Sequence, residues 1–345
     1  MRTTSFVSAV LLAAALASQS PTPPSPPATP TAVRLVYELP VDALQRALRG
    51  QTDRDLEQVL AETVANVQVR IGDEAKVARQ GAIGFTVDLA NADAAAIDLA
   101  RRRIETVGKL EMRIVADSDY LVDGVSFDLP AERARLVAWL DAGGREKLRA
   151  DPTAIESFHD DAKGPLAGKH LRWFVHRIGA DARNAGQWQP SMQTWLRNAC
   201  VPAFTDEDWN AGALPTRIQK LPADQRHLVE LVAVNMHEMH FGNRDLDPKG
   251  ITVAPAGDGG LALQYRTIDA RAADYGNWSE KHVGKYSAIL WNDEVLMVPC
   301  FMSRIPGRGQ ISGSLSSTEF ETMQRALQAP PLAAQPRFVR QEPGK

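Results

Sequence analysis

The chain has 345 residues, of which 44% are hydrophobic and 23% are charged, and its formal net charge is -3. This composition is typical of a globular protein and excludes a chain that is disordered or membrane-embedded throughout. The 39 Lys and Arg residues against 42 Asp and Glu leave no overall charge that would draw the chain to nucleic acid.

Residues 1–17 have the pattern of a secretory signal peptide. Arg2 precedes an apolar run, residues 6–17, that ends in Ala-Leu-Ala, a sequence that signal peptidase accepts. The run is shorter than the ~20 residues of a membrane-spanning helix, so we expect export to the periplasm or cell envelope. If the signal stays uncleaved, it would tether the N-terminus to the inner membrane. Residues 18–32 are rich in proline and predict an extended linker.

Strand and helix patterns alternate through residues 33–116. The predicted elements, in chain order, are a strand at 33–39 (VRLVYEL), a helix with apolar side chains at helical spacing from Leu56 to Val67, a strand at 81–89, a helix at 92–105 and a strand at 109–116 (KLEMRIVA). The order β-α-β-α-β predicts an α+β domain. Residues 117–227 are harder to interpret, because loop signals interrupt helical patterns and one strand pattern at 170–178. We treat them as an irregular, mostly helical insertion.

Residues 228–328 again show clear patterns. A buried strand is predicted at 228–234, and two strands at 250–255 and 260–267 flank a Gly-rich turn. A hairpin follows at 286–301, centred on Asn292-Asp293, a pair that suits a turn with positive backbone dihedrals. Ser316 and Glu319 form a capping box that begins a helix. The proline-broken segment 329–345 predicts a flexible tail.

His237, Glu238 and His240 invite comparison with zinc hydrolases. Their spacing is His-Glu-x-His, not the His-Glu-x-x-His that places both histidines on one helix face. The segment continues a β-branched strand pattern, and residues three apart in a strand point to opposite faces. We therefore expect partly exposed histidines and no metal or other cofactor here.

Two further patterns fall short of a functional motif. Asn243, Asp245 and Asp247 have calcium-loop spacing, but a proline replaces the required glycine and no acid stands at the twelfth position, so Asp245 is expected to cap a turn. Cys200 and Cys300 are the only cysteines, and their spacing does not fit a zinc site. The sequence leaves both a disulfide and two separately buried thiols open.

The segment SRIPGRGQISG, residues 303–313, resembles a phosphate-binding loop only superficially. Its glycines do not follow the G-x-G-x-x-G order, no Gly-Lys-Ser/Thr is present, and it follows an antiparallel hairpin. We expect a structural loop whose glycines permit a tight backbone path. Arg304 and Arg308 within it are candidates for contact with a partner. Trp278 and Trp291, which flank turns, are further surface candidates.

Taken together, residues 286–327 (YSAILWNDEVLMVPCFMSRIPGRGQISGSLSSTEFETMQRAL) resemble the end of the large periplasmic domain of SecD, an accessory subunit of the bacterial protein-export channel. That family has a strand pair of the form IVLDGKVxxAPxI, then I..GRGQITG.F and a short helix. In the same order, RLVYEL (34–39), IETVGKLEMRIV (104–115) and residues 240–267 resemble other parts of that domain. The insertion 117–227 has no counterpart in the resemblance.

The SecD resemblance implies a ferredoxin-like base, residues 33–116, with an inserted α+β head, residues 228–328. It also implies a role beyond the membrane, in contact with polypeptide emerging from the Sec translocon. The family's proton-driven cycle needs transmembrane helices, and the chain stops where the second of these would begin, so we expect no proton-coupled motor. The resulting hypothesis is a non-catalytic exported protein that binds translocating polypeptide or a translocon component. The alternative is a secreted enzyme with a site built in the insertion.

Overall fold

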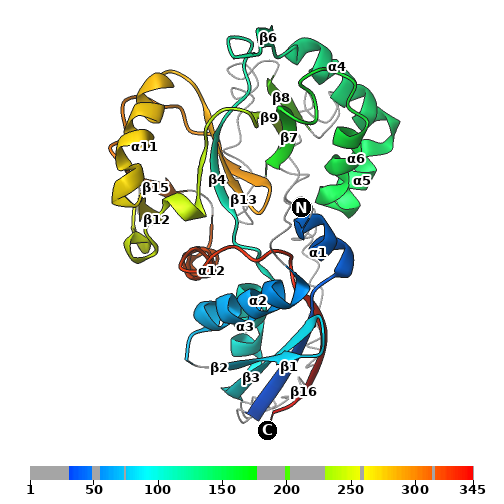
Figure 1. Ribbon diagram of the computed structural model, residues 1–345, viewed down its shortest axis with the longest axis vertical. Helices are drawn as coiled ribbons and strands as arrows, with labels where there is room; N and C mark the ends of the chain where they lie inside the picture. The colour runs from blue at the N-terminus through cyan, green and yellow to red at the C-terminus, as the bar shows by residue number, and fades with distance from the viewer. Residues whose placement is uncertain are drawn as a thin grey trace, which may run out of the picture.

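The computed structural model describes residues 31–48, 55–73, 75–176, 199–202, 230–256, 260–312 and 315–344. The predicted signal peptide, and the predicted linker as far as residue 30, lie outside these ranges. Two bodies, each built of β-sheet with helices packed on it, follow one another along the long axis of the molecule (Figure 1). The fold class is α+β, as the sequence predicted. Within the described ranges, every helix falls short of the length and apolarity that crossing a bilayer requires.

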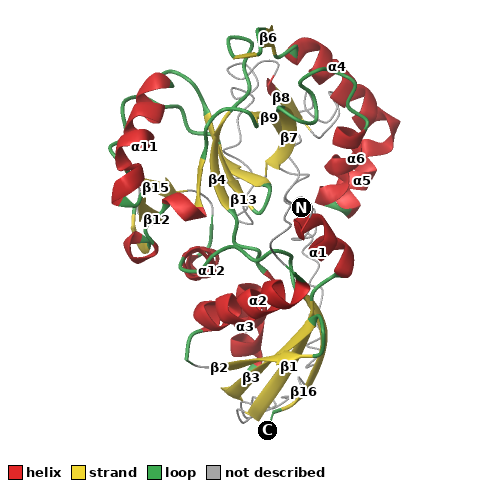
Figure 2. Ribbon diagram, in the orientation of Figure 1, coloured by secondary structure: helices red, strands yellow, loops and turns green. Residues whose placement is uncertain are grey.

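The smaller body is the base. It consists of β1 (Thr31–Glu38), α1 (Val41–Leu48), α2 (Leu56–Ile71), β2 (Ala75–Gln80), β3 (Gly84–Ala92), α3 (Ala94–Glu105) and β16 (Arg337–Pro343). The strands lie in the order β16-β1-β3-β2, and every neighbouring pair is antiparallel. With α2 and α3 on one face of the sheet (Figure 2), this is the predicted ferredoxin-like arrangement.

The helix α2 forms where the apolar spacing predicted it. Asp55 caps its first turn, and the side chain of Gln58 closes a capping box by accepting from the Asp55 backbone N–H. Val59, Leu60 and Val67 are buried against the sheet, whereas Leu56 is exposed at the end of the helix. These side chains join apolar residues of β1 and β3 in one core cluster, which holds the base together.

Two expectations about the base are wrong. The strand at Leu110–Ile114, expected to close the base sheet, lies instead in the other body, and the segment expected to be a flexible tail supplies the closing strand β16. Burial explains the exchange. All five residues of Leu110–Ile114 are buried, which requires cover on both faces, whereas β16 is largely exposed and suits the edge of a one-sided sheet.

The larger body is the head, and it is organised around a seven-stranded sheet. Its strands are β10 (Phe241–Gly242), β4 (Leu110–Ile114), β13 (Ser287–Trp291), β14 (Glu294–Met297), β7 (Leu171–His176), β9 (Glu230–Asn235) and β8 (Cys200–Pro202), neighbours in that order. A bridge between Val115 and Val234 links the end of β4 back to β9. The sheet therefore curls, and five of its strands form a closed ring of pairings.

The predicted insertion belongs partly to this sheet. Its described elements are β5 (Leu121–Val122), β6 (Val125–Ser126), α4 (Leu129–Trp139), α5 (Arg145–Ala150), α6 (Ile155–Asp160), β7 and β8. The helices lie on one side of the sheet, and α11 (Asp269–Lys281), which the sequence did not predict, lies on the other (Figure 2). Residues 177–198 and 203–227 of the insertion lie outside the described ranges.

A second, three-stranded sheet extends the head. It has the order β11 (Thr252–Pro255), β12 (Leu261–Arg266), β15 (Arg308–Ser312), all antiparallel, and it confirms the two strands predicted around the Gly-rich turn. One face packs on α12 (Ser317–Leu327), where the predicted capping box of Ser316 and Glu319 is present. The helix α12 also contacts α2 and α3, so it lies between head and base (Figure 1).

The predicted hairpin is present as β13 and β14. Asn292 and Asp293 form its turn with φ of 53° and 63°, the left-handed conformation that the Asn-Asp pair suggested. The side-chain oxygen of Asn292 accepts hydrogen bonds from the backbone N–H groups of Gly108 (2.8 Å) and Lys109 (3.0 Å). The turn thus also fixes the point where the chain enters the head.

Candidate functional site

The strand β15 is the last strand of the three-stranded sheet, and its other edge has no partner strand among the described residues. Gly307 O accepts from Thr267 N at 2.8 Å where β15 begins. Because bonding alternates along an antiparallel ladder, Gly309 and Ile311 then point their N–H and C=O groups toward β12. The same groups of Arg308, Gln310 and Ser312 point to the free edge, where a further strand could pair with them.

Two glycines of the GRGQ segment serve the packing of this strand. Gly307 has φ of 74°, which a side chain would strain, and it turns the chain into β15. Gly309 faces Tyr265, and a Cβ added there would lie 2.3 Å from the tyrosine Oη. That hydroxyl hydrogen-bonds Tyr275 Oη at 2.8 Å, and burial raises the pKa of Tyr265 well above its ordinary value. The two glycines are therefore explained by backbone conformation at Gly307 and by close packing against Tyr265 at Gly309.

The outward side of this sheet, which we call the cationic face, carries five exposed polar side chains: Lys249, Gln264, Arg266, Arg308 and Gln310. They line an open hollow of about 570 Å³. Asp247 accepts from Arg266 Nε at 2.7 Å, and this bond, helped by the backbone N–H of Lys249, lowers the pKa of Asp247. No carboxylate in the described part of the chain lies within ion-pair distance of Arg308.

The four predicted contact residues do not gather at one place. Arg308 belongs to the cationic face. Arg304 is also exposed, but its guanidinium covers Gly276 of α11 and lies 3.5 Å from a carboxylate oxygen of Glu280. Trp291 is half-buried and packs against the core under the three-stranded sheet.

The prediction that Trp278 lies at the surface is wrong. Only 2% of Trp278 is exposed, and its ring lies 5.2 Å from that of Phe241 and 5.1 Å from that of Phe301. The residue faces inward from α11, a helix that the sequence pattern did not reveal. Two members of the cationic face, Lys249 and Arg266, were in turn missed. The alternation of β12 could have indicated Arg266, because it stands on the polar side of a predicted strand.

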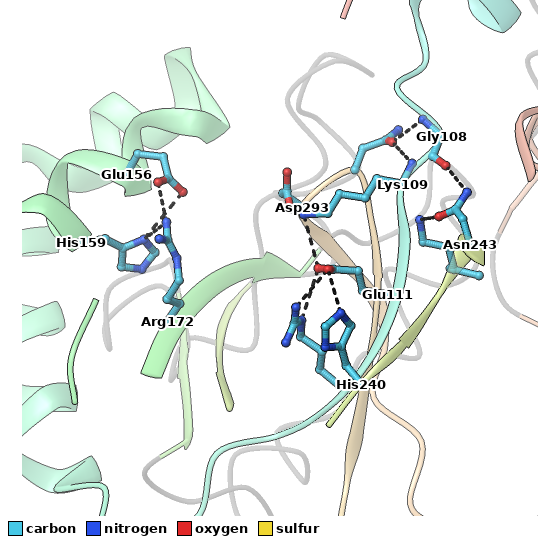
Figure 3. Close-up of polar contacts among 12 residues, drawn as sticks. Gly108, Lys109, Glu111, Glu156, His159, Arg172, His240, Asn243 and Asp293 are labelled. Atoms are coloured by element: carbon cyan, nitrogen blue, oxygen red, sulfur yellow. Dashed lines mark hydrogen bonds and ion pairs between the residues drawn. The ribbon is translucent and has the colours of Figure 1, made fainter. Parts of the chain in front are cut away.

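Charged side chains gather on β4 and beside it (Figure 3), and of these Glu111 and Arg113 are buried. Glu111 pairs with Arg113 at 3.0 Å, with Lys109 at 3.4 Å and with His240 at 3.7 Å. Burial by itself raises the pKa of Glu111, but Arg113 and Lys109 outweigh it and hold that pKa below its ordinary value. Burial also lowers the pKa of His240. The carboxylate therefore stays charged and is engaged by cations of the protein itself.

The other predicted acids and histidines are similarly engaged. The strand β9 ends at Asn235, whose side chain accepts from the N–H groups of His237 and Glu238, so the expectation that a strand continues through the histidines is wrong. Asp245 accepts from Gly242 N at 2.9 Å and from Arg271 Nε at 2.8 Å, as expected of a turn cap. No group of three metal-binding side chains occurs within the described residues.

The insertion contributes a separate cluster of Glu156, His159 and Arg172 (Figure 3). His159 Nε2 accepts from the backbone N–H of Trp173 at 3.0 Å, while its Nδ1 faces Glu156 and Arg172. The bond with His159 and the charge of Arg172 lower the pKa of Glu156 to about 2. Since both ring nitrogens are occupied, the cluster fastens α6 to β7. No disulfide joins Cys200, which is buried, to Cys300, which is half-buried.

Comparison with known proteins gives similarity to solved structures alone, since no family model and no curated protein matches the chain. A crystal structure of SecDF in its super-membrane-facing form is 15% identical with a TM-score of 0.46, and covers 92% of this chain, which spans 32% of that one. A second structure, of a membrane component SecDF that enhances protein export, is 14% identical with a TM-score of 0.47 over 89% of this chain and 98% of that one. A third, of SecDF from Thermus thermophilus, a translocon-associated membrane protein, is 14% identical with a TM-score of 0.27. All three of these similar structures are of SecDF.

Proposed function

We propose that the chain binds extended polypeptide at the free edge of β15, in a SecD-like role accessory to protein export, and that it catalyses no reaction. The observation that carries the proposal is the edge itself. Arg308, Gln310 and Ser312 direct their backbone N–H and C=O groups away from the sheet, and a strand that adds there gains hydrogen bonds whatever its sequence. Polypeptide in transit through a membrane is extended and varied in sequence, so this mode of binding suits it.

The free energy available from backbone pairing at the β15 edge favours short-lived binding. Three outward residues offer six backbone hydrogen bonds, each worth about 1 kcal/mol net. Their sum of about 6 kcal/mol is comparable with the ~4–15 kcal/mol that association loses in freedom of motion. Backbone pairing alone therefore gives weak, rapidly reversed binding. An accessory factor that must release its substrate is served by weak binding, and added affinity must come from side chains.

The motif positions support the proposal. The residues that most resemble SecD, GRGQIS, form β15 and the turn into it. The proposed location is the periplasm or cell envelope, reached through the predicted signal peptide, with a Sec translocon component as the second partner. The described part of the insertion offers no support for the enzyme alternative. Its one buried histidine, His159, has both ring nitrogens in contact with groups of the protein itself, Nε2 with the Trp173 backbone and Nδ1 with Arg172.

Site-specific photocrosslinking tests the proposal. A photoreactive amino acid at Gln310, which is exposed on β15, is expected to crosslink to exported polypeptides in cells and to a reduced, alkylated, permanently unfolded polypeptide in vitro. The same probe at Ala65, exposed on α2 of the base where the backbone is paired within the helix, serves as the control. Equal crosslinking from both positions, or none from Gln310, would contradict binding at the β15 edge.

A further inference from the structure

We infer that the cationic face makes β15 selective for acidic segments of polypeptide, which add antiparallel to it with Asp or Glu at alternate positions. This inference rests on the proposed function and names the kind of segment that the same edge selects. It starts from the weakness of backbone pairing alone, because stable capture then depends on the side chains beside the edge. Those side chains are cationic.

Three cations form a row across the sheet. Arg266 and Arg308 are directly opposed on β12 and β15, and Lys249 lies beyond Arg266 at the same hollow. The stem of Arg266 covers Gly250, where an added Cβ would lie 2.6 Å from Arg266 Cγ. Like charges directly opposed across two strands destabilise a sheet. Within the described chain, Asp247 is the single carboxylate paired with this row, so the row retains an excess of positive charge.

The row ends at the free edge. Arg308 is its last member, and Arg308 also points its backbone groups outward, so one residue offers both a charge and a hydrogen-bonding pair to an added strand. Gln310, two positions on, offers its amide on the same side, next to Gln264 of β12. A strand has a repeat of two residues, so acids at alternate positions of a bound segment would meet Arg308 and then Gln310.

The direction of the added strand follows from the sheet. Both pairings in it are antiparallel. In an antiparallel pair, residues that exchange hydrogen bonds have their side chains on one face. The acidic residues of the segment are therefore those whose own N–H and C=O groups pair with β15, and the intervening residues point their backbone groups to solvent.

An anionic membrane surface is a different partner for such a face, and the structure favours it less. None of the described exposed large apolar side chains comes from β11, β12 or β15, whereas binding to a lipid surface relies on apolar side chains beside the charges. The free edge, in addition, has hydrogen-bonding groups that a lipid surface would leave unused. A peptide satisfies both the charges and the edge.

Fluorescence anisotropy of the full chain with labelled peptides tests the inference. A peptide alternating valine and glutamate is expected to bind at least tenfold more tightly at low salt than its valine and lysine counterpart, and to lose that preference as salt screens the charges. N-methylation of the glutamates should abolish binding, whereas N-methylation of the valines should leave it intact. The reverse pattern of N-methylation effects would overturn antiparallel addition.

Charge reversal on the protein completes the test. Arg308→Glu is expected to remove the preference for glutamate, whereas Arg337→Glu, exposed on β16 of the base, should retain it. If glutamate and lysine peptides bind equally at the β15 edge, the inference fails while the proposed function stands. If no peptide and no unfolded polypeptide binds, the proposed function fails with it. Sedimentation with vesicles of anionic phospholipid, with no binding of acidic peptide, would assign the face to a membrane and overturn the inference.

Discussion

Arg70 is predicted to join the base to the head mechanically, and its replacement by methionine tests this. The side chain is fully buried in α2 and has no carboxylate partner in the described chain. Its guanidinium donates instead to the carbonyl oxygens of Thr106, Val107 (2.7 Å) and Pro330 (3.3 Å). The first two residues lie where the chain leaves the base, and Pro330 lies where it returns.

The size of the effect follows from these contacts. Hydrogen bonds from a charged donor are worth about 1.5–3 kcal/mol each, so three of them supply about 4.5–9 kcal/mol. Burial opposes them, because it lowers the pKa of Arg70 from 12.5 to about 10, which corresponds to roughly 3 kcal/mol. The Arg70→Met variant should therefore lose about 3 kcal/mol of stability, although the methionine keeps most of the apolar packing.

Urea unfolding measured by two signals checks this prediction. The base, residues 31–105 and 337–343, contains no tryptophan, so tryptophan fluorescence reports on the head and far-ultraviolet circular dichroism on both bodies. In Arg70→Met the two transitions should separate. Arg79→Met, which removes only an exposed ion pair with Glu57, should cost less than about 0.5 kcal/mol and keep them together. Coincident transitions and an unchanged midpoint in Arg70→Met would refute the role given to Arg70.

Three further substitutions test local features of the head. Asn292→Ala should lower the free energy of unfolding by about 1–3 kcal/mol, because it leaves two backbone N–H groups without an acceptor. Asn292→Asp keeps an acceptor and should lower it less. Equal losses of stability in chemical denaturation would contradict this. Gly309→Ala should lower the free energy of unfolding by about 1–3 kcal/mol, because the new Cβ would clash with Tyr265 Oη. Adding Tyr265→Phe should restore part of that stability in thermal unfolding. A double variant with no gain in stability would count against the contact. Burial holds the pKa of His159 below its ordinary 6.5, so the folded state binds fewer protons than the unfolded one and stability should fall as pH drops below about 6.5. His159→Gln should reduce that fall in urea titrations between pH 7 and pH 5.5, and identical slopes would show that another group is responsible.

Local chemistry made several elements of this fold predictable. The hairpin turn at Asn292-Asp293 and the capping box at Ser316 each depend on residues within a few positions of one another, and both are present. The closing strand of the base was not predictable in this way. The residues Val33 and Pro343 pair across almost the whole chain, and the mostly polar β16 has no alternating pattern of its own.

The candidate site was predictable only in part. Arg308 stood out because it lies in a motif, but its neighbours on the cationic face come from β12 and from the turn before β11. Their proximity is a property of strand order, which a single sequence does not specify. Trp278 was wrongly predicted to lie at the surface because the helix that contains it was not recognised. The helix α11 is too polar to show a clear apolar stripe, so its one deeply buried face was not apparent.

The split base has a consequence for the order in which the chain can fold. The strand β16 pairs with β1 only after the whole head has been synthesised, because the head lies between Glu105 and Arg337. Until then the outer edge of β1 stays unpaired, and the base has only the three strands β1, β3 and β2. The head, whose strands are complete by Ser312, can finish first. Pairing of β16 with β1 therefore completes the base sheet only after every strand of the head is available.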